Sequence, residues 1–477
     1  MVKCFKLLIF FLFSLSMITC VNANNDFNSL DSAIRNNDVV TLTNDVVISD
    51  DEKNNYSDGI IINKNVVIDG NGYSIDARGI TRIFKIRKGK MTIKNVALKN
   101  GRFNGDGGAI SLSKTLPFNF CDVRLDVVNS TFVNNTASGS GGAISFVGRL
   151  PFLFFGGKLD VINSTFINNT ASGSGGAIST NHIIIHNHVN YNRFVNNTAG
   201  IKGGSISNRF FDSIDNNWFG SNDIDDQIYG KQPVRYFIIN TTGDGTNLFY
   251  NFRLNDTQDT NGYRFPSFNG EIYLNNVFNR TFDASMNNQC FNFNLHDNIT
   301  IKVDNFEYNY TCIPYLSDVY VSSSGSDLNN GSKDSPVKEF NTAMDYVKDG
   351  GTVHVLDDLN LDKTVNILKN ITIKSDDGLK TLNGNNMQIF NISPNFNVNI
   401  SNLKLTNGFA SYGGAVYSNK SNLNLSNCIF DSNNVEINGG AVFITGGVNY
   451  LNNCTFINNQ AENEGGGIIT DNMSTRC

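Results

Sequence analysis

Charged residues are scarce in this sequence, and no stretch of it is strongly basic. Of its 477 residues 17% are charged, and the formal net charge is −6. A protein that binds nucleic acid needs clustered Lys and Arg to displace counterions from the phosphates. We therefore expect no nucleic-acid partner. The polar residues are mostly Asn, Thr, Ser and Gly, which suit strands and tight turns and are poor helix formers.

Cysteine is also sparse. Cys4 and Cys20 lie close to the N-terminus, and the other six of the eight are too widely spaced for a small fold held together by disulfides. Two pairings stay open, Cys290 with Cys312 and Cys428 with Cys454.

Long apolar runs are missing beyond the N-terminus. There, Lys3 and Lys6 precede an apolar run over residues 7–18, and Val21-Asn22-Ala23 follows. This order predicts a secretory signal peptide, residues 1–23, that is cleaved after Ala23. The run is shorter than the roughly 20 residues that a transmembrane helix needs, and a lipid anchor on Cys20 is a further alternative. We expect an exported mature chain without a transmembrane segment.

What the sequence has in abundance is a repeat. Residues 126–145 read DVVNSTFVNNTASGSGGAIS, and residues 160–179 read DVINSTFINNTASGSGGAIS, 34 positions later. A third copy begins at residue 192, and two more surround Phe430 and Phe456, which are 26 positions apart. Repeats of this length are typical of solenoids, in which each coil buries its apolar side against its neighbours.

Each copy has the same physical logic. Phe132 and Phe166 point to the interior of a strand, and the Asn pair that follows makes a turn. The glycine pairs then permit a tight corner where a Cβ would not fit; they are Gly141 with Gly142 and Gly175 with Gly176. The prediction is an all-β chain built on a right-handed parallel β-helix. A series of antiparallel hairpins, the alternative, would not show a long fixed repeat.

Two segments have helical spacing and are expected to cap the first coil of a solenoid. Phe27, Leu30 and Ile34 form the first; Phe340, Met344 and Val347 form the second, for which Ser335-Pro336 is expected to start the helix. Two caps imply two solenoid units.

The glycine repeats vanish between the two solenoids, where short alternating runs predict an immunoglobulin-like β-sandwich. The expected organisation is a signal peptide (1–23), a first β-helix with its N-terminal cap helix (24–228), the sandwich (229–316) and a second β-helix (317–477). The last coil lacks a capping sequence, so we expect the second β-helix to be C-terminally incomplete.

The paired GG(A/I/L/V) and FxxN motifs at coil spacing resemble the polymorphic outer-membrane protein repeats of chlamydiae, on a pectin-lyase-like parallel β-helix. The Asn/Thr-rich setting, the IDGNGYSID start, the NNWFGSN segment and the interposed sandwich are similar to the adhesin-like surface proteins of methanogenic archaea. This resemblance implies a protein of the cell surface or cell envelope that acts in attachment. It implies no catalytic residues and no cofactor.

Parallel β-helices also include polysaccharide lyases and hydrolases, so a carbohydrate-active enzyme is the second hypothesis; a purely structural envelope protein is the third. The sequence has no GHG and no RxK motif. Asp126 and Asp160 occupy equivalent places in successive coils, as do Arg124 and Lys158. A lyase would use such residues for calcium and proton abstraction, but charged ladders on a solvent-facing strand are the simpler account. We predict no enzyme.

Two further groups are candidates for metal binding and for closing the core. His182, His186 and His188 share strand parity and could hold a metal, although no nearby residue completes the site. Trp218, the single tryptophan, is expected to plug the open end of the first core. Cys428 and Cys454 take the place of Ser130 and Ser164, which favours a buried ladder of small residues over a disulfide.

The leading binding candidate is a pair of apolar insertions at residues 112–120 and 146–155, at matching points of two coils. Stacked together they would form an aromatic patch of Phe118, Phe120, Phe152, Phe154 and Phe155. Exposed patches of this kind mark partner sites, here for glycans or surface proteins of other cells; alternatively the two insertions bury each other. Sequons make N-glycosylation of an exported chain possible, for example at Asn134, Asn168, Asn196, Asn298 and Asn391.

Overall fold

The computed structural model describes residues 25–113, 123–147, 157–180, 187–208, 213–230, 232–233, 235–256 and 265–470. The chain forms two compact units. Unit 1 comprises Met1–Thr241, Tyr250–Gln289 and Thr300–Asn309; unit 2 comprises Thr242–Phe249, Cys290–Ile299 and Tyr310–Cys477. Strands dominate both units, and most sheets are parallel, so the predicted all-β class with parallel stacking is confirmed.

Helix α1 (Phe27–Asn36) opens the described part of unit 1 and buries Phe27, Leu30 and Ile34, the three residues with helical spacing. Its first turn is capped twice. The side chain of Asp26 accepts a hydrogen bond from the Ser29 amide at 2.9 Å. The buried carboxylate of Glu52 accepts one from the Asn28 amide at 2.6 Å, where the positive end of the helix favours an anion.

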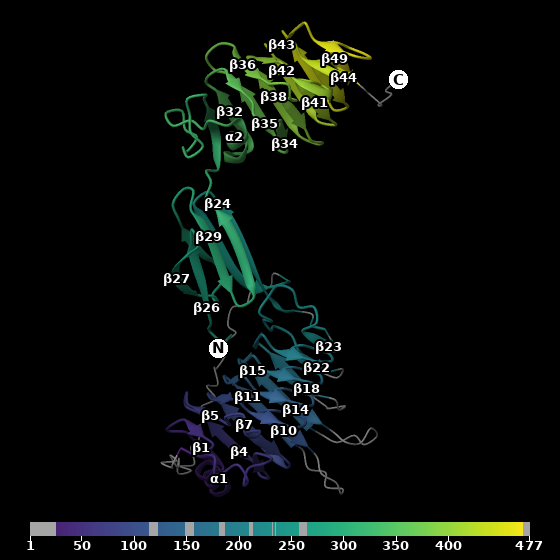
Figure 1. The fold of residues 1–477 in the computed structure, drawn as a ribbon. Coiled ribbons are helices and arrows are strands. Elements are labelled where there is room, and N and C mark those ends of the chain that lie inside the picture. The colour runs from purple at the N-terminus through teal and green to yellow at the C-terminus, as the bar shows by residue number, and fades with distance from the viewer. Residues whose placement is uncertain are drawn as a thin grey trace, which may run out of the picture. The chain divides into compact units, whose positions relative to one another are not determined.

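Parallel sheets follow, in which successive strands come from successive rungs (Figure 1). The first contains β1 (Val39–Thr41), β4 (Val66–Asp69), β7 (Gly89–Lys94), β11 (Val123–Val128), β15 (Gly157–Ile162) and β19 (Asn187–Asn190). The second contains β2 (Val46–Val47), β5 (Ser74–Asp76), β8 (Ala97–Lys99), β12 (Thr131–Val133), β16 (Thr165–Ile167) and β20 (Arg193–Val195).

The remaining parallel sheets of unit 1 close the other sides of the rungs. One contains β3 (Ile60–Ile62), β6 (Phe84–Ile86), β10 (Ile110–Ser113), β14 (Ile144–Val147), β18 (Ile178–Thr180), β22 (Ile206–Asn208) and β23 (Ile228–Gly230). The other contains β9 (Arg102–Phe103), β13 (Thr136–Ala137), β17 (Thr170–Ala171) and β21 (Thr198–Ala199).

Equivalent residues of the repeat face one another across these sheets. Phe132 is the register partner of Phe166, which is in turn the partner of Phe194. The rings stack face to face, with centroids 4.7 and 4.9 Å apart, and all three are fully buried. This column is the ladder that the repeat predicts.

The two asparagines of the FxxNN motif have different tasks. The first, for example Asn134 with φ 56°, makes the left-handed turn and is exposed. The second points inward and is fully buried, as at Asn135 and Asn169. The side-chain nitrogen Nδ2 of Asn135 donates to Asn169 Oδ1 at 2.9 Å and to the carbonyl oxygen of Leu98 at 3.1 Å. The motif therefore forms an amide ladder inside the stack as well as a turn.

The glycine pair is required twice over. Gly141 has φ 69°, in the left-handed region that favours glycine. A Cβ on Gly142 would lie 2.1 Å from the carbonyl oxygen of Gly176 in the next rung, and Gly175 and Gly176 repeat the arrangement. The corner is tight because rungs touch there through their backbones.

Two further sheets follow in sequence. One contains β24 (Phe237–Asp244), β25 (Asn247–Leu254) and β28 (Gln289–Asn292); the other contains β26 (Asn269–Leu274), β27 (Val277–Asp283), β29 (Asn298–Val303) and β30 (Phe306–Thr311). Strands β26 and β27 pair antiparallel, unlike the strands of the stack.

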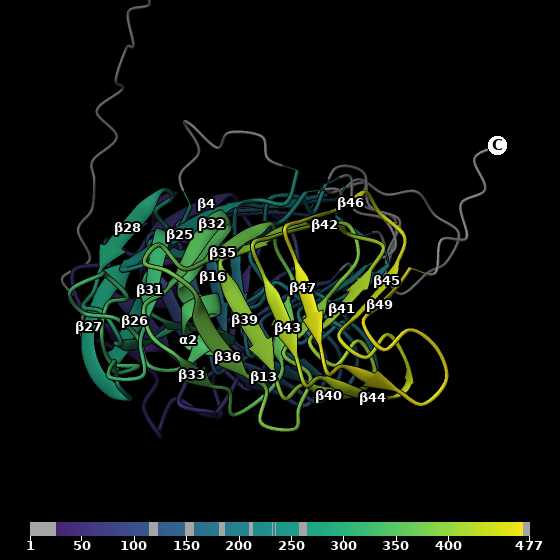
Figure 2. The same cartoon turned by 90° about the horizontal axis from the view of Figure 1, so that it is seen from above.

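Unit 2 repeats the parallel arrangement. Its first sheet contains β31 (Leu316–Val321), β32 (Val347–Val355), β35 (Ile371–Lys374), β38 (Asn397–Ser401), β42 (Asn422–Ser426) and β46 (Asn449–Asn452). The second contains β33 (Leu359–Asn360), β36 (Lys380–Asn383), β39 (Leu403–Thr406), β43 (Ile429–Asp431) and β47 (Thr455–Ile457), and the third contains β34 (Val365–Ile367), β37 (Phe390–Ile392), β41 (Val416–Asn419), β45 (Val442–Thr445) and β49 (Ile468–Thr470). The fourth contains β40 (Phe409–Tyr412), β44 (Asn434–Asn438) and β48 (Gln460–Ala461). Seen end on, β42, β43 and β45 lie on different sides of the coil (Figure 2).

Helix α2 (Phe340–Tyr346) starts later than the sequence predicts. Ser335-Pro336 does not begin it, because the next residue, Val337, is held in an extended bridge. The Val337 amide donates to Tyr320 at 3.0 Å, and its carbonyl accepts from Ser322 at 3.0 Å. The chain therefore remains extended past the proline. No helix in the described residues is long and apolar enough to cross a membrane.

A pair of substitutions in one corner of unit 2 tests the glycine contacts. In Gly440→Ala the new Cβ would lie 2.1 Å from the carbonyl oxygen of Gly466, and we expect a loss of about 1–3 kcal/mol of stability. Gly467→Ala is the control, because its Cβ would have no neighbour closer than 3.5 Å and Ala441 already occupies the equivalent place one rung earlier. It should be neutral or raise stability by up to about 1 kcal/mol.

Hydrogen exchange of the amides in β45 and β49 measures both effects locally. Faster exchange in Gly440→Ala alone supports the backbone contact, and equal effects of the two substitutions would contradict it.

Candidate functional site

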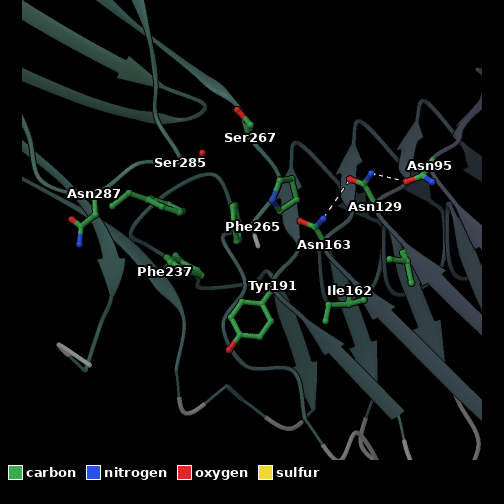
Figure 3. A pocket seen from close by; sticks show the side chains of 13 residues that line it. Asn95, Asn129, Ile162, Asn163, Tyr191, Phe237, Phe265, Ser267, Ser285 and Asn287 are labelled. Atoms are coloured by element: carbon green, nitrogen blue, oxygen red, sulfur yellow. Dashed lines mark hydrogen bonds between the residues drawn. The ribbon is translucent and has the colours of Figure 1, made fainter. Parts of the chain in front are cut away.

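In four successive rungs of unit 1 the chain turns from the first sheet to the second through one residue in the left-handed conformation. In three successive rungs this residue is Asn95, Asn129 or Asn163, with φ between 47° and 54°. Their side chains form an outer ladder (Figure 3). Asn129 Nδ2 donates to Asn95 Oδ1 at 2.7 Å, and Asn163 Nδ2 donates to Asn129 Oδ1 at 3.4 Å. Tyr191, with φ 59°, takes this place in the next rung, so the amide ladder ends at Asn163.

A groove of about 770 Å³ lies along this outer ladder, within unit 1. One wall consists of the three asparagines together with Val128, Ile162 and Tyr191. The other wall comes from the segment around β24–β27 and consists of Phe237, Phe252, Phe265, Pro266, Ser267, Ser285 and Asn287. Figure 3 shows the ladder pointing along the groove towards Phe265.

The second wall is fixed to the stack by one acidic residue. Asp304 accepts hydrogen bonds from Arg193 Nε at 3.0 Å and from the indole nitrogen of Trp218 at 2.8 Å, and Arg193 Nη2 forms an ion pair with it. Trp218 packs edge-on against Phe252, with ring centroids 5.6 Å apart. A two-nitrogen contact from arginine to a carboxylate is directional as well as strong, so the groove has a defined shape.

Trp218 is fully buried at this junction. It does not itself continue the phenylalanine column. Its neighbour Phe219 stacks on Phe194, with centroids 5.4 Å apart, while Trp218 faces Phe252.

The residues of the predicted aromatic patch, Phe118, Phe120, Phe152, Phe154 and Phe155, lie outside the described residues. So do His182 and His186. His188 lies on β19 with Asp160 as its register partner. Within the described part of the chain, no group of three or more His, Cys, Asp or Glu side chains could hold a metal ion.

The charged positions of the first sheet form ladders. Lys90, Arg124 and Lys158 are register partners in three successive rungs, and Asp126 faces Asp160. Ion pairs join Lys90 to Asp126 and Lys158 to Asp160. The charged ladder expected at these positions is therefore present, and both carboxylates are engaged with lysines.

The repeats that contain the stacked phenylalanines and asparagines match a known family of repeats. The Chlamydia polymorphic membrane protein repeat is found at residues 129–146, 163–181 and 453–471. The chain carries repeats of this type in both units. The chain has no match among curated proteins and none among solved structures. The matched segments contain the buried phenylalanine, the inner asparagine and the glycine pair, so the resemblance rests on residues that hold rungs together.

Cys428 and Cys454 are free thiols, as are Cys290 and Cys312, so neither pairing left open by the sequence is formed. The Sγ atom of Cys428 lies 3.3 Å from the carbonyl of Ser426. Ser130 Oγ makes the equivalent contact with the carbonyl of Val128, at 2.9 Å. Cysteine thus replaces serine in the same hydrogen-bonding role. Burial raises the pKa of the Cys428 thiol to about 11.

One polar cluster in unit 2, which consists of Asp318, His354 and Asp376, was not predicted from the sequence. His354, only 6% exposed, hydrogen-bonds through Nδ1 to Asp376, and its Nε2 lies 3.0 Å from Asp318 Oδ1. Its ring stacks on Tyr320 at 4.4 Å. The pKa of Asp376 lies below its ordinary value, chiefly because Lys374 donates a hydrogen bond to it. Asp376 and Asp318 are 22 and 36 residues away from His354 in sequence, so no local pattern brings the three together.

The four thiols should differ sharply in reactivity. Thiolate is the reactive form, so Cys428, buried and with its pKa raised to about 11, should resist alkylation at about pH 8. Cys290 is exposed and should be labelled readily. Site-resolved mass spectrometry after iodoacetamide treatment measures both rates in one sample. Labelling in denaturant is the control, and Cys428 reacting as fast as Cys290 in the native protein would contradict the buried ladder.

Proposed function

We propose that this chain is a secreted or cell-surface, adhesin-like protein that acts in attachment or in contacts of the cell envelope. The observation that carries the proposal is the polymorphic membrane protein repeat, found in rungs of both units. The named family consists of membrane proteins, which supports a location at the cell surface. The signal peptide over residues 1–23 and N-glycosylation at exported sequons belong to the same proposal.

The proposed architecture is two right-handed parallel β-helices of the pectin-lyase type, at residues 24–228 and 317–477, with an immunoglobulin-like sandwich at 229–316. Its support is the regular register of the parallel sheets, one strand per rung, before and after the segment in which β26 and β27 pair antiparallel. Stacked rungs contact only their neighbours, so length can grow by adding rungs without changing the core. Such a scaffold suits the display of binding surfaces.

Binding is proposed over catalysis. Asp126 and Asp160, the residues that a lyase would use for calcium, are paired with Lys90 and Lys158. A carboxylate whose charge is already compensated by a lysine attracts a cation less. The proposed partners are glycans or surface proteins of other cells.

Attachment tests this function. The mature chain should bind saturably to some intact cells in a panel. A variant with Phe118, Phe152, Phe154 and Phe155 changed to Ser should bind about tenfold more weakly or worse, since aromatic anchors dominate interfaces. The matched control changes four aromatics exposed elsewhere, Phe278, Phe409, Tyr412 and Tyr450, to Ser and should bind normally.

Glycans incubated with the chain should be recovered uncut. Shortened glycans would contradict the proposal in favour of an enzyme. An absence of binding to every cell type would favour a structural envelope protein.

A further inference from the structure

The groove along the outer ladder carries no charge. All thirteen described residues that line it are Asn, Ser, Val, Ile, Tyr, Phe or Pro. A second hollow of about 400 Å³ shares Asn95 and Asn129 with it and adds only uncharged residues, among them Asn71 and Thr131. An anionic ligand would lose hydration in the groove without gaining a cationic partner, and the carboxylates of Asp69 and Asp283 behind the walls are already hydrogen-bonded to Asn95, Ser267 and Ser285. The composition of the walls therefore favours a neutral ligand.

The ladder offers hydrogen bonds at a regular spacing. Rungs of a parallel sheet lie about 4.8 Å apart, so the amides of Asn95, Asn129 and Asn163 present donors and acceptors at that interval. At its end, Asn163 Oδ1 is shielded from water and accepts no hydrogen bond from the described residues, because Tyr191 stands where the next asparagine would donate. An acceptor left in this state costs free energy. Each ladder amide nitrogen has two N–H groups, and the structure shows one of them in use, by Asp69, Asn95 or Asn129. A ligand with hydroxyl groups can accept from the other.

The rest of the groove is apolar. Ile162 is 43% exposed and Val128 37% exposed, although both are large hydrophobic residues. Both line the groove, and Ile162 stands beside the outer ladder, across from Phe237 and Phe265 (Figure 3). Sites for small molecules combine such apolar walls with a few placed polar groups. A ligand with hydroxyl groups on its edges and C–H groups on its faces would therefore be complementary to the groove.

A sugar ring has this chemistry. We propose that the groove beside Asn95, Asn129 and Asn163 binds a neutral oligosaccharide, whose repeating units follow the rungs. The inference deepens the proposed function, because it names a ligand class for a surface protein, but it concerns a different site from the aromatic patch. A peptide fits less well, since the ladder presents side-chain amides and not the open backbone edge that an extended peptide pairs with.

Isothermal titration of the mature chain, produced without N-glycosylation, tests the proposal. The ligands are neutral manno-, gluco-, galacto- and N-acetylglucosamine oligomers, with oligogalacturonate and a mixed peptide library as comparison. At least one neutral series should bind, with affinity rising with length over the first few sugars. Oligogalacturonate should bind at least about tenfold more weakly than the best neutral series.

Two variants alter the groove with little risk to folding. Asn129→Gly introduces a residue that adopts the left-handed turn without strain and removes the middle side-chain amide of the ladder. Ile162→Ser removes an exposed apolar side chain from the wall of the groove. Each should weaken binding about tenfold. The matched controls are Asn134→Gly, at an exposed left-handed turn of the same rung, and Ile457→Ser, at an isoleucine that is also 43% exposed. Both should bind like the unaltered chain.

Three outcomes would overturn the groove proposal. Either no neutral glycan binds, or the groove variants bind glycans as tightly as the unaltered chain does, or the groove variants lose binding to peptides and not to glycans. Attachment to cells, measured on the same proteins, separates this failure from that of the proposed function. Attachment without neutral-glycan binding removes the groove proposal alone. Glycan binding lost in the groove variants, on a chain that attaches to no cell, supports the groove and removes the adhesin.

Discussion

The buried amide ladder is the interaction on which both stacks depend. At the corner that follows the phenylalanine strand, backbone groups face the interior of the rung, where unpaired N–H and C=O groups are costly. The inner asparagine pairs them. Asn135 Oδ1 accepts from the Gly101 amide at 2.8 Å, and Asn135 Nδ2 reaches both the Leu98 carbonyl and Asn169. Asn433 does the same in unit 2, with the Gly408 amide, the Leu405 carbonyl and Asn459. No apolar residue could make these contacts, so the asparagine is fixed in place relative to the phenylalanine.

This ladder keeps its register while the rungs change length. Asn135 and Asn169 are 34 residues apart, whereas Asn169 and Asn197 are 28 apart, yet the amide contact is 2.9 Å in both. The difference in length falls between β14 and β15, outside the corner that holds the ladder. Insertions can therefore vary without disturbing the core, which is why the ends of strands, and not the repeat itself, are where a solenoid can acquire new surfaces.

Sequence reasoning succeeded where a residue's neighbours are copies of itself. The phenylalanine column and the glycine corner follow from the 34-residue repeat, because like residues of successive rungs must meet. It failed where the partner lies elsewhere. The predicted start of α2 was wrong because Val337 bridges to β31 and stays extended. The contacts among Asp318, His354 and Asp376 depend on the register of neighbouring strands. The groove could not be predicted at all: its second wall is held by Arg193 and Asp304, which are 111 residues apart.

A regular ladder uses one N–H of each side-chain amide and pairs each amide oxygen with the next rung; a break in the ladder leaves the last oxygen unpaired. The outer asparagines illustrate this. Asn95 and Asn129 each have their Oδ1 occupied by the next rung, but Tyr191 interrupts the series and leaves Asn163 Oδ1 without a donor. The same interruption places a ring beside the exposed Ile162, where the segment around β24–β27 adds further aromatics. The repeat supplies the scaffold, and the rung of Tyr191, which departs from the repeat, supplies the groove with an aromatic ring.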